Sequence, residues 1–330
     1  MNALVRAASL TNFFDVARSL GLNPQSLLRD AGLSPGLLAD PEQRIPVASA
    51  VRVLEKAAQE SGCIDLGLRM AESRQLSDFG VVSLLISHQR TLRDALTVTM
   101  QYRHLLNAGL AMQLEDVGDM VIIREEVMAQ THSRQAIELA LGVLHRMCAG
   151  LMGARWSPRW VSFTHTAPED LSLHRRIFTC RIEFDSEFNG IACRASDLDA
   201  LNPGADPVMA RYARQFVDSL PAATKPSTVL EVRRAIYLML PSGRATSDYV
   251  AQSLGLSVRS MQRQLDQADT SFTKVLAEVR GELVTRYLAN PRHSMTEVSQ
   301  LLGYNNPSSF TRWFTAQFGV APQNWRKSGR

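Results

Sequence analysis

The feature that most constrains the fold of this 330-residue chain is a repeat near its C-terminal end. Residues 250–257 read VAQSLGLS and residues 298–305 read VSQLLGYN, so Val, Gln, Leu and Gly recur at an offset of 48. The correspondence resumes at an offset of 49, pairing Ser260 with Ser309, Met261 with Phe310, Arg263 with Arg312 and Leu265 with Phe314. One inserted residue in the turn explains the shift. The repeat therefore predicts two copies of one structural unit.

Each copy has the local signals of a helix-turn-helix unit. A short amphipathic helix ends at Gly255 or Gly303, and glycine readily takes the left-handed conformation that stops a helix and reverses the chain. The next helix begins at a polar capping residue, Ser257 in the first copy and Asn305 or Asn306 in the second. The sequence thus predicts two helix-turn-helix units.

The second helix of each copy has a packing face and a polar face. The packing faces hold Val258, Met261 and Leu265 in the first copy and Phe310, Phe314 and Phe318 in the second. Arginine can bond to guanine and glutamine to adenine in the major groove, and hydroxyls suit phosphates or base edges. The residues expected to contact DNA are Arg259, Ser260, Gln262, Arg263, Ser308, Ser309, Thr311 and Arg312.

A solvated helix face is the other explanation of these polar side chains, and isolated charged runs usually have it. The distribution of charge favours DNA contact instead. Residues 225–330 carry a net charge of +7, whereas residues 1–224 carry −3. A basic module joined to a mildly acidic one is expected to meet a polyanion through its basic part only.

The domain boundary is expected at residues 221–228, which contain two prolines and no large apolar side chain. We predict an effector-sensing and dimerisation domain over residues 1–220 and a DNA-binding domain over 229–328. Between the repeats, residues 272–288 read as one uninterrupted helix that fixes the separation of the two units. Helices held in this way can enter successive major grooves about 34 to 36 Å apart, so DNA reading does not require a dimer.

The N-terminal domain reads as α+β. Residues 47–58 and 92–106 have apolar side chains at helical spacing. Strand-like alternation occurs at 110–115 and 120–127, which are joined by a turn at 116–119, and at 160–165 and 181–185. The predicted fold class is α+β, mainly helical, with an N-terminal α/β domain and an all-α C-terminal domain whose two helix-turn-helix units are joined by a linker helix.

The second unit, LLGYNNPSSFTRWFTAQFGVAPQNWR, resembles the signature of the AraC/XylS family of bacterial transcription regulators. The Leu-Gly-Tyr turn, the Pro-Ser-Ser-Phe opening, the Phe-Gly-x-x-Pro exit and the Trp325-Arg326 pair carry the likeness, although the family more often has tyrosine at the position of Trp325. VAQSLGLSVRSMQRQL is similar to the family's more variable first unit, and SFTKVLAEVRGELVTRYL to its connecting helix. The resemblance implies a sequence-specific regulator of double-stranded DNA, an activator that contacts RNA polymerase. It implies base contacts from Arg259, Gln262, Arg263, Ser308, Ser309 and Arg312 and a phosphate contact from Thr311.

The segments LSDFGVVSLLISHQRTLRDAL and RWSPRWVSFTHTAPED resemble the helical sensor domain of a subgroup that regulates amino-acid catabolism and virulence. This implies a small-molecule effector and allows a homodimer. The strands expected are too few for the cupin-type barrel of the family's founding member, so arabinose is not the favoured ligand. Polar and aromatic side chains expected to line an effector pocket are Tyr102, Arg103, His104, Trp156 and Trp160, with Arg103 facing an effector carboxylate.

The sequence gives no signal for a cofactor or a metal site. Its seven histidines are scattered, and Cys63, Cys148, Cys180 and Cys193 never form a C-x-x-C pair, so buried, reduced thiols are expected. No apolar run approaches the roughly 18 residues of a membrane span, and the N-terminus lacks the apolar core of a secretion signal. We therefore expect a cytoplasmic protein without a membrane partner.

Two alternatives stay open. The first is a DNA-modifying or alkylation-response protein that uses the helix-turn-helix units as an address, with Cys180 or Cys193, each followed by arginine, as the reactive thiol. The second is a regulator controlled by protein contact without an effector. Because neither cysteine has a recognisable ligand cluster around it, we do not expect an enzyme.

Overall fold

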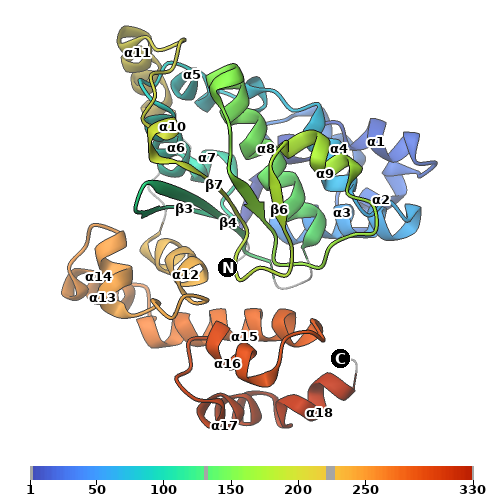
Figure 1. The fold of residues 1–330 in the computed structure, drawn as a ribbon, viewed down its shortest axis with the longest axis vertical. Helices are drawn as coiled ribbons and strands as arrows, with labels where there is room; N and C mark the ends of the chain where they lie inside the picture. Colours follow the sequence, from blue (N-terminus) through green and yellow to red (C-terminus); the bar gives the residue numbers. More distant parts are fainter. Residues whose placement is uncertain (1–2, 130–132, 221–226, 329–330) are drawn as a thin grey trace. The chain divides into compact units, whose positions relative to one another are not determined.

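The chain forms two compact units, which divide between residues 225 and 226 in a computed structural model that describes residues 3–129, 133–220 and 227–328. We call them the N-terminal and C-terminal units (Figure 1). Most of the expected linker, residues 221–226, lies outside the described residues. The remaining two linker residues belong to a helix, because Ser227 caps it and Thr228 is its first residue.

The N-terminal unit contains a five-stranded mixed sheet in the order β3-β4-β7-β5-β6. The β3–β4, β4–β7 and β7–β5 pairs are antiparallel, and the β5–β6 pair is parallel. A separate antiparallel pair joins β1 to β2. The strands are β1 (Leu4–Arg6), β2 (Arg44–Pro46), β3 (Leu110–Val117), β4 (Met120–Val127), β5 (Trp160–Ser162), β6 (Arg181–Glu183) and β7 (Gly190–Arg194).

Helix α8 (Arg134–Met152) contributes residues to both hydrophobic clusters of this unit. Its Leu141, Leu144 and Met147 belong to the cluster beneath the sheet, and Ile137 and Leu139 belong to the cluster of the N-terminal helices. A segment of 22 residues that includes α8 is long and apolar enough to span a membrane, but 67% of its most apolar 18-residue stretch is buried inside the structure. Such burial is typical of a core helix that is apolar all round.

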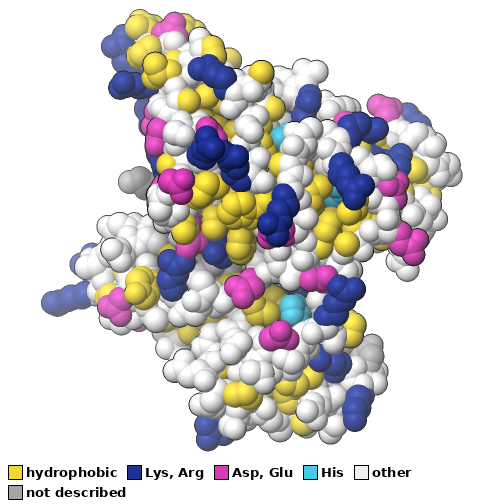
Figure 2. Space-filling view, viewed as in Figure 1, with side chains coloured by type: hydrophobic (Ala, Val, Ile, Leu, Met, Phe, Trp, Pro, Cys, Tyr) yellow, Lys and Arg dark blue, Asp and Glu magenta, His cyan; other side chains and the backbone are white. Residues whose placement is uncertain are grey.

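The other helices of the N-terminal unit are short. They are α1 (Phe13–Ser19), α2 (Pro24–Asp30), α3 (Val47–Ser61), α4 (Leu66–Glu72), α5 (Val82–Ser87), α6 (Leu92–Gln101), α7 (Arg103–Leu106), α9 (Ser172–Phe178), α10 (Ala195–Leu198) and α11 (Pro207–Asp218), with 3-10 segments η1 (Ala7–Leu10), η2 (Pro35–Ala39), η3 (Leu76–Phe79) and η4 (Gly153–Arg155). Hydrophobic and basic side chains gather on the surface over α11 (Figure 2). Its exposed apolar residues are Val208, Met209, Tyr212 and Phe216.

The predicted fold class, α+β and mainly helical, is confirmed, with local differences. The helix predicted over residues 92–106 is two helices, because the chain leaves helical geometry at Tyr102 between α6 and α7. The turn between β3 and β4 is shorter than the predicted turn at 116–119, because the strands stay paired as far as Val117 and Met120. Gly118, with a φ of +64°, lies in this turn. Strand β7, which has no polar alternation because its first four residues are buried, was not predicted.

All regular secondary structure in the described part of the C-terminal unit is helical. Helix α12 precedes the first repeat, α13 and α14 form that repeat, α15 connects the two repeats, and α16 and α17 form the second, followed by α18. Their bounds are α12 (Thr228–Met239), α13 (Ser247–Ser253), α14 (Val258–Asp266), α15 (Phe272–Ala289), α16 (Met295–Leu301), α17 (Pro307–Phe318) and α18 (Pro322–Lys327).

Candidate DNA-binding and effector sites

Helix α14 begins and packs as the first repeat predicts. The Ser257 hydroxyl accepts a hydrogen bond from the Ser260 backbone N–H at 3.1 Å, which caps the helix. Gly255 has a φ of +66° and reverses the chain before this cap. Met261 and Leu265 are fully buried, so the opposite face of α14 is turned to solvent. That face exposes Arg259, Gln262, Arg263 and Asp266, while Ser260 is half-buried.

Helix α17 repeats the arrangement with a different cap. Asn306, one of the two capping residues that we predicted, accepts from the Ser309 backbone N–H at 2.8 Å through its side-chain oxygen, and Gly303 has a φ of +67°. Phe310 and Phe314 are fully buried. The polar face of α17 exposes Ser308, Thr311, Arg312 and Thr315, while Ser309 is half-buried.

Two of the hydroxyls expected at the DNA surface already take part in hydrogen bonds inside their own helices, Thr311 as a donor and Ser260 as an acceptor. Thr311 Oγ1 donates to the Pro307 carbonyl at 2.9 Å, and the Ser257 hydroxyl donates to Ser260 Oγ at 2.9 Å. The Thr311 hydroxyl has donated its proton and suits a phosphate oxygen only after it rotates, whereas Ser260 keeps its own proton available to a phosphate oxygen. The exposed guanidinium groups of Arg259, Arg263 and Arg312 are not so committed, and the structure gives them no side-chain partner among the described residues.

The connecting helix α15 holds the second helix-turn-helix unit through Arg280, a residue that was not predicted to have a role. Arg280 donates through Nε to the Leu302 carbonyl at 2.9 Å and through Nη2 to the Gly303 carbonyl at 3.2 Å. Its guanidinium carbon lies 4.2 Å from the centre of the Tyr304 ring, within cation–π range. The turn of the second unit is therefore fastened directly to α15.

The first unit is fastened to α15 through α12. Arg233 of α12 forms ion pairs with Glu278 and Glu282 of α15, and the Tyr237 hydroxyl donates to Glu282. At the other end of α15, Arg326 of α18 donates through Nε to the Leu288 carbonyl at 3.1 Å. Thr228 of α12 also bonds to Gln264 of α14, and Phe314 of α17 packs against Trp325 of α18. Each recognition helix is thus tied to α15 through a neighbouring helix.

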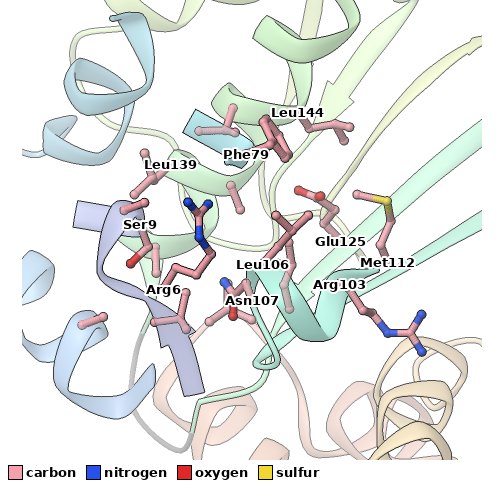
Figure 3. Close-up of a pocket in the computed structure, with 18 of the residues that line it drawn as sticks. Arg6, Ser9, Phe79, Arg103, Leu106, Asn107, Met112, Glu125, Leu139 and Leu144 are labelled. Carbon is pink, nitrogen blue, oxygen red and sulfur yellow. The ribbon is translucent and has the colours of Figure 1, made fainter. Parts of the chain in front are cut away.

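The N-terminal unit contains a largely apolar cavity of about 180 Å³ (Figure 3). It lies between strand β1, helices α3 and α8 and the inner face of strands β3 and β4. Its polar lining comes from Arg6, Ser9, Arg74, Asp78, Thr99, Arg103, Asn107 and Glu125. A cavity of this kind, apolar with a few polar groups, is typical of a small-molecule site.

Glu125 is a buried carboxyl group of the cavity lining without a hydrogen-bond donor among the described residues. It is 2% exposed, and no described residue donates a hydrogen bond to its Oε2. In Figure 3 its carboxyl group points from β4 toward the middle of the lining residues. Burial raises the pKa of the Glu125 carboxyl well above its usual value.

Two arginines of the cavity lining, Arg6 and Arg74, are bonded to groups other than Glu125. Arg6 forms an ion pair with Glu42 and donates through Nη1 to the Asp78 carbonyl at 2.8 Å. Arg74 donates through Nη1 to the Ala8 carbonyl at 2.6 Å and lies 3.9 Å from the Asp78 carboxylate. Burial lowers the pKa of Arg74 to about 10, so Arg74 stays charged at neutral pH.

The structure does not bring the five predicted effector residues together. Of these five, only Arg103 lines the cavity, and its guanidinium points away from the other side chains in Figure 3. Tyr102 is buried and donates to Asp218 at 2.6 Å, with the His104 ring 6.4 Å away. Trp156 is buried and donates through Nε1 to His145 Nδ1 at 3.1 Å. Trp160 is half-buried in β5. Side chains that the pattern suggested for a pocket are here part of the packing.

The cysteines have the wrong electrostatics for nucleophilic chemistry. Burial raises the pKa of the Cys180 thiol to about 11 and that of Cys193 to about 12, whereas a reactive thiolate needs a lowered pKa. Cys63 and Cys148 are buried free thiols. Within the described residues, no group of three or more His, Cys, Asp or Glu side chains is placed to hold a metal ion.

Comparisons with known families match both units. The family described as "Arabinose-binding domain of AraC transcription regulator, N-term" matches residues 21–201, and the family described as "Helix-turn-helix domain" matches residues 250–328. The first match includes the whole five-stranded sheet, and the second includes α14, α15 and α17.

Similar proteins extend over the whole chain. The HTH-type transcriptional regulator VirS of Mycobacterium tuberculosis is 27% identical over 100% of this chain and 98% of its own length. The ornithine utilization regulator of Pseudomonas aeruginosa is 25% identical over 98% of this chain and 97% of its own. The crystal structure of the transcriptional regulator CdpR from Pseudomonas aeruginosa is 18% identical, covers 92% of this chain and 96% of that chain, and has a TM-score of 0.47.

Proposed function

Because this chain belongs to the AraC family of transcription regulators, we propose that it reads a bipartite DNA site by placing α14 and α17 in two successive major grooves. One observation carries the proposal: each of these helices has a buried apolar face, a capped start and an exposed polar face, and both are held by one connecting helix. Non-specific surface helices have no need of such a fixed separation.

Base contacts are assigned first to Arg263 and Arg312. They occupy equivalent positions in the two repeats, and both are exposed. A guanidinium can bond bidentately to guanine O6 and N7, which gives base discrimination of about 1 to 3 kcal/mol. Arg259, Gln262, Ser308 and Ser309 complete the reading surface. Ser260 is assigned to a phosphate because its hydroxyl proton stays available, and Thr311 is assigned to a phosphate that it reaches when its hydroxyl rotates away from the Pro307 carbonyl.

The length of α15 suits this arrangement. Its 18 residues span about 27 Å at 1.5 Å per residue. Because α14 precedes α15 in the chain and α17 follows it, a separation of about 34 Å, one turn of DNA, is compatible with a connector of this length.

Selection of bound sites from random DNA tests the base contacts. We expect Arg263→Ala and Arg312→Ala each to cost about 1 to 3 kcal/mol in affinity for the selected site and each to relax preference at a different base position. Lys274→Ala, on the exposed surface of α15, is the matched control and should leave the base preference unchanged. Equal losses for all DNA sequences in both arginine variants would mean that these side chains contact phosphates and would contradict the assignment.

We further propose that the N-terminal unit binds a small-molecule effector in the cavity beside β3 and β4. We also propose that the protein activates transcription in the cytoplasm by contacting RNA polymerase, and that it has no enzymatic activity. The raised pKa values of the cysteines support the last point over an alkylation-response role. Control by protein contact alone predicts that no small molecule changes DNA binding or stability, which a ligand screen with DNA-binding and thermal readouts decides.

The exposed apolar residues of α11 favour a homodimer as the state in solution, because contiguous exposed apolar side chains mark interaction surfaces. Sedimentation of the full chain tests this. A Phe216→Ser variant should shift the protein toward the monomer, while the exposed Gln215→Ser on the same helix should not. A wild-type monomer at high micromolar concentration would exclude the dimer.

A further inference from the structure

We propose that the cavity of the N-terminal unit takes a small organic ammonium ion, an amine on a compact apolar body, whose charged head binds Glu125. This inference rests on the effector-binding function proposed above and adds the chemical class of the effector. It assigns to Glu125 the specificity for that class.

The first argument is the position of Glu125 in its strand. Along β4, buried and half-buried residues alternate, and Val121, Ile123, Glu125 and Val127 are the buried ones. An acidic residue therefore occupies a register position that apolar residues take on either side of it. The residue paired with it in β3, Met112, also lines the cavity. A strand that needed only to pack would have an apolar residue there.

The second argument is the missing partner. An acid buried without a donor is unfavourable, because desolvation is not repaid by any hydrogen bond. The other charged side chains that line the cavity leave Glu125 alone: Arg6 is paired with Glu42, Arg74 lies beside Asp78, and Arg103 turns its guanidinium away. Among the residues that the structure describes, burial is the cause that raises the pKa of the Glu125 carboxyl, and no described charged group lowers it. A bound ammonium would supply both the donors and the opposite charge.

The third argument is size and lining. The cavity volume of about 180 Å³ is slightly larger than the roughly 150 Å³ of an engineered protein cavity that holds benzene. A single ring or a short branched chain therefore fits beside the head group. The apolar lining comes from side chains such as Val51, Leu54, Phe79, Leu106, Leu139 and Leu144. A hydrophilic sugar would leave most of its hydroxyls without partners against such walls.

Binding has a defined proton balance. Burial raises the pKa of Glu125 in the empty cavity, and a bound ammonium lowers it again. At a pH between these two pKa values, the carboxyl therefore releases up to one proton to solvent for each amine bound as its cation. The affinity for an amine should consequently rise with pH across that interval, as long as the amine itself stays protonated.

Three probes that share one apolar body test the proposal on the full chain: 2-phenylethylamine, 2-phenylethanol and 3-phenylpropanoate. We expect the amine to raise the melting temperature and to bind in calorimetry with proton release, and the alcohol and the carboxylate to bind at least several-fold more weakly. Glu125→Gln should weaken amine binding about 10- to 100-fold, since a charge-assisted hydrogen bond is lost. Glu126→Gln is the matched control, because Glu126 is the next residue of β4 and bonds to Asn189 on the other face.

The outcomes separate this inference from the function on which it rests. Amine binding that is lost in Glu125→Gln and kept in Glu126→Gln supports it. If Glu125→Gln fails to fold, the rise of wild-type amine affinity with pH takes its place as the supporting result. Preferred binding of the carboxylate or the alcohol, or equal amine binding by both variants, overturns the inference but leaves effector binding standing. Binding of none of the three also overturns it, and DNA selection on the same preparation then shows whether the regulator function survives.

Discussion

Replacing Arg280 with methionine should loosen the second helix-turn-helix unit while the first stays intact. Arg280 provides two hydrogen bonds from a charged donor, to the carbonyls of Leu302 and Gly303, and a cation–π contact to Tyr304. Bonds of this kind contribute about 1.5 to 3 kcal/mol each when buried. Because the guanidinium is only partly buried and water replaces part of the loss, we expect a local cost of about 2 to 3 kcal/mol. Methionine keeps the apolar stem of the side chain, so packing against α15 changes little.

Hydrogen exchange of the full chain, resolved by peptide, measures this cost where it arises. A loss of 2 to 3 kcal/mol corresponds to exchange that is about 30- to 150-fold faster in peptides from residues 295–318, with no change in α13 and α14. Affinity for the bipartite site should fall, because the second unit must then be ordered on binding, while base preference at the positions read by α14 is retained.

Lys274→Met on the same helix is the control and should stay within about 0.5 kcal/mol of the wild type, since the Lys274 side chain is exposed. Exchange in residues 295–318 that is unchanged by Arg280→Met would refute the idea that Arg280 fastens the turn. Equal loosening by both variants would show a general effect of removing charge from α15.

Two further predictions concern stability. Burial and the nearby Arg146 lower the pKa of His145 to about 4, and protonation would break the hydrogen bond that Trp156 donates to it. The stability that His145 contributes is therefore present above pH 6.5 and is lost as the pH falls toward 4, so the difference in unfolding free energy between the wild type and His145→Gln should shrink by about 2 kcal/mol between pH 6.5 and pH 5. Urea unfolding followed by tryptophan fluorescence measures this difference, and a constant difference would argue against the prediction. Gly255→Ala and Gly303→Ala both place a side chain at positive φ, which should cost about 1 kcal/mol or more of stability. Gly303→Ala should cost more, because its Cβ would lie 3.2 Å from Leu240 Cδ1, whereas the Cβ at Gly255 meets nothing within 4 Å. Equal losses of the two variants in thermal unfolding would show that Leu240 moves aside.

The architecture of the C-terminal unit could be predicted because its determinants are local. Glycines at positive φ, the Ser257 cap and the alternation of buried and exposed side chains on α14 and α17 act over a few residues and leave a periodic pattern. The fastening of the units could not be predicted in the same way. Arg280 bonds to residues 22 and 23 positions away, and Arg233 reaches Glu282 across 49, so neither contact leaves a local pattern.

The N-terminal unit shows where local patterns mislead. Apolar spacing continues through Tyr102 into Leu105 and Leu106, so the break between α6 and α7 is invisible to periodicity, and the bond from Tyr102 to Asp218 joins residues 116 apart. The predicted effector residues are polar and aromatic side chains, and a local pattern does not show that Tyr102 and Trp156 are bonded within the core. The sequence does contain a signal for Glu125. The alternation of the predicted strand 120–127 places this acidic residue on the apolar face of the strand.

The connecting helix α15 also determines which rearrangements of a target site the protein can tolerate. An insertion of five base pairs between the half-sites would turn one of them to the far side of the duplex. An insertion of ten would bring it back to the same side but about 34 Å further away. A dimer with a flexible connection can recover in the second case, whereas a chain whose two reading helices are fastened to one 18-residue helix cannot. Promoters served by this regulator are therefore expected to vary in the letters of their half-sites and hardly at all in the distance between them.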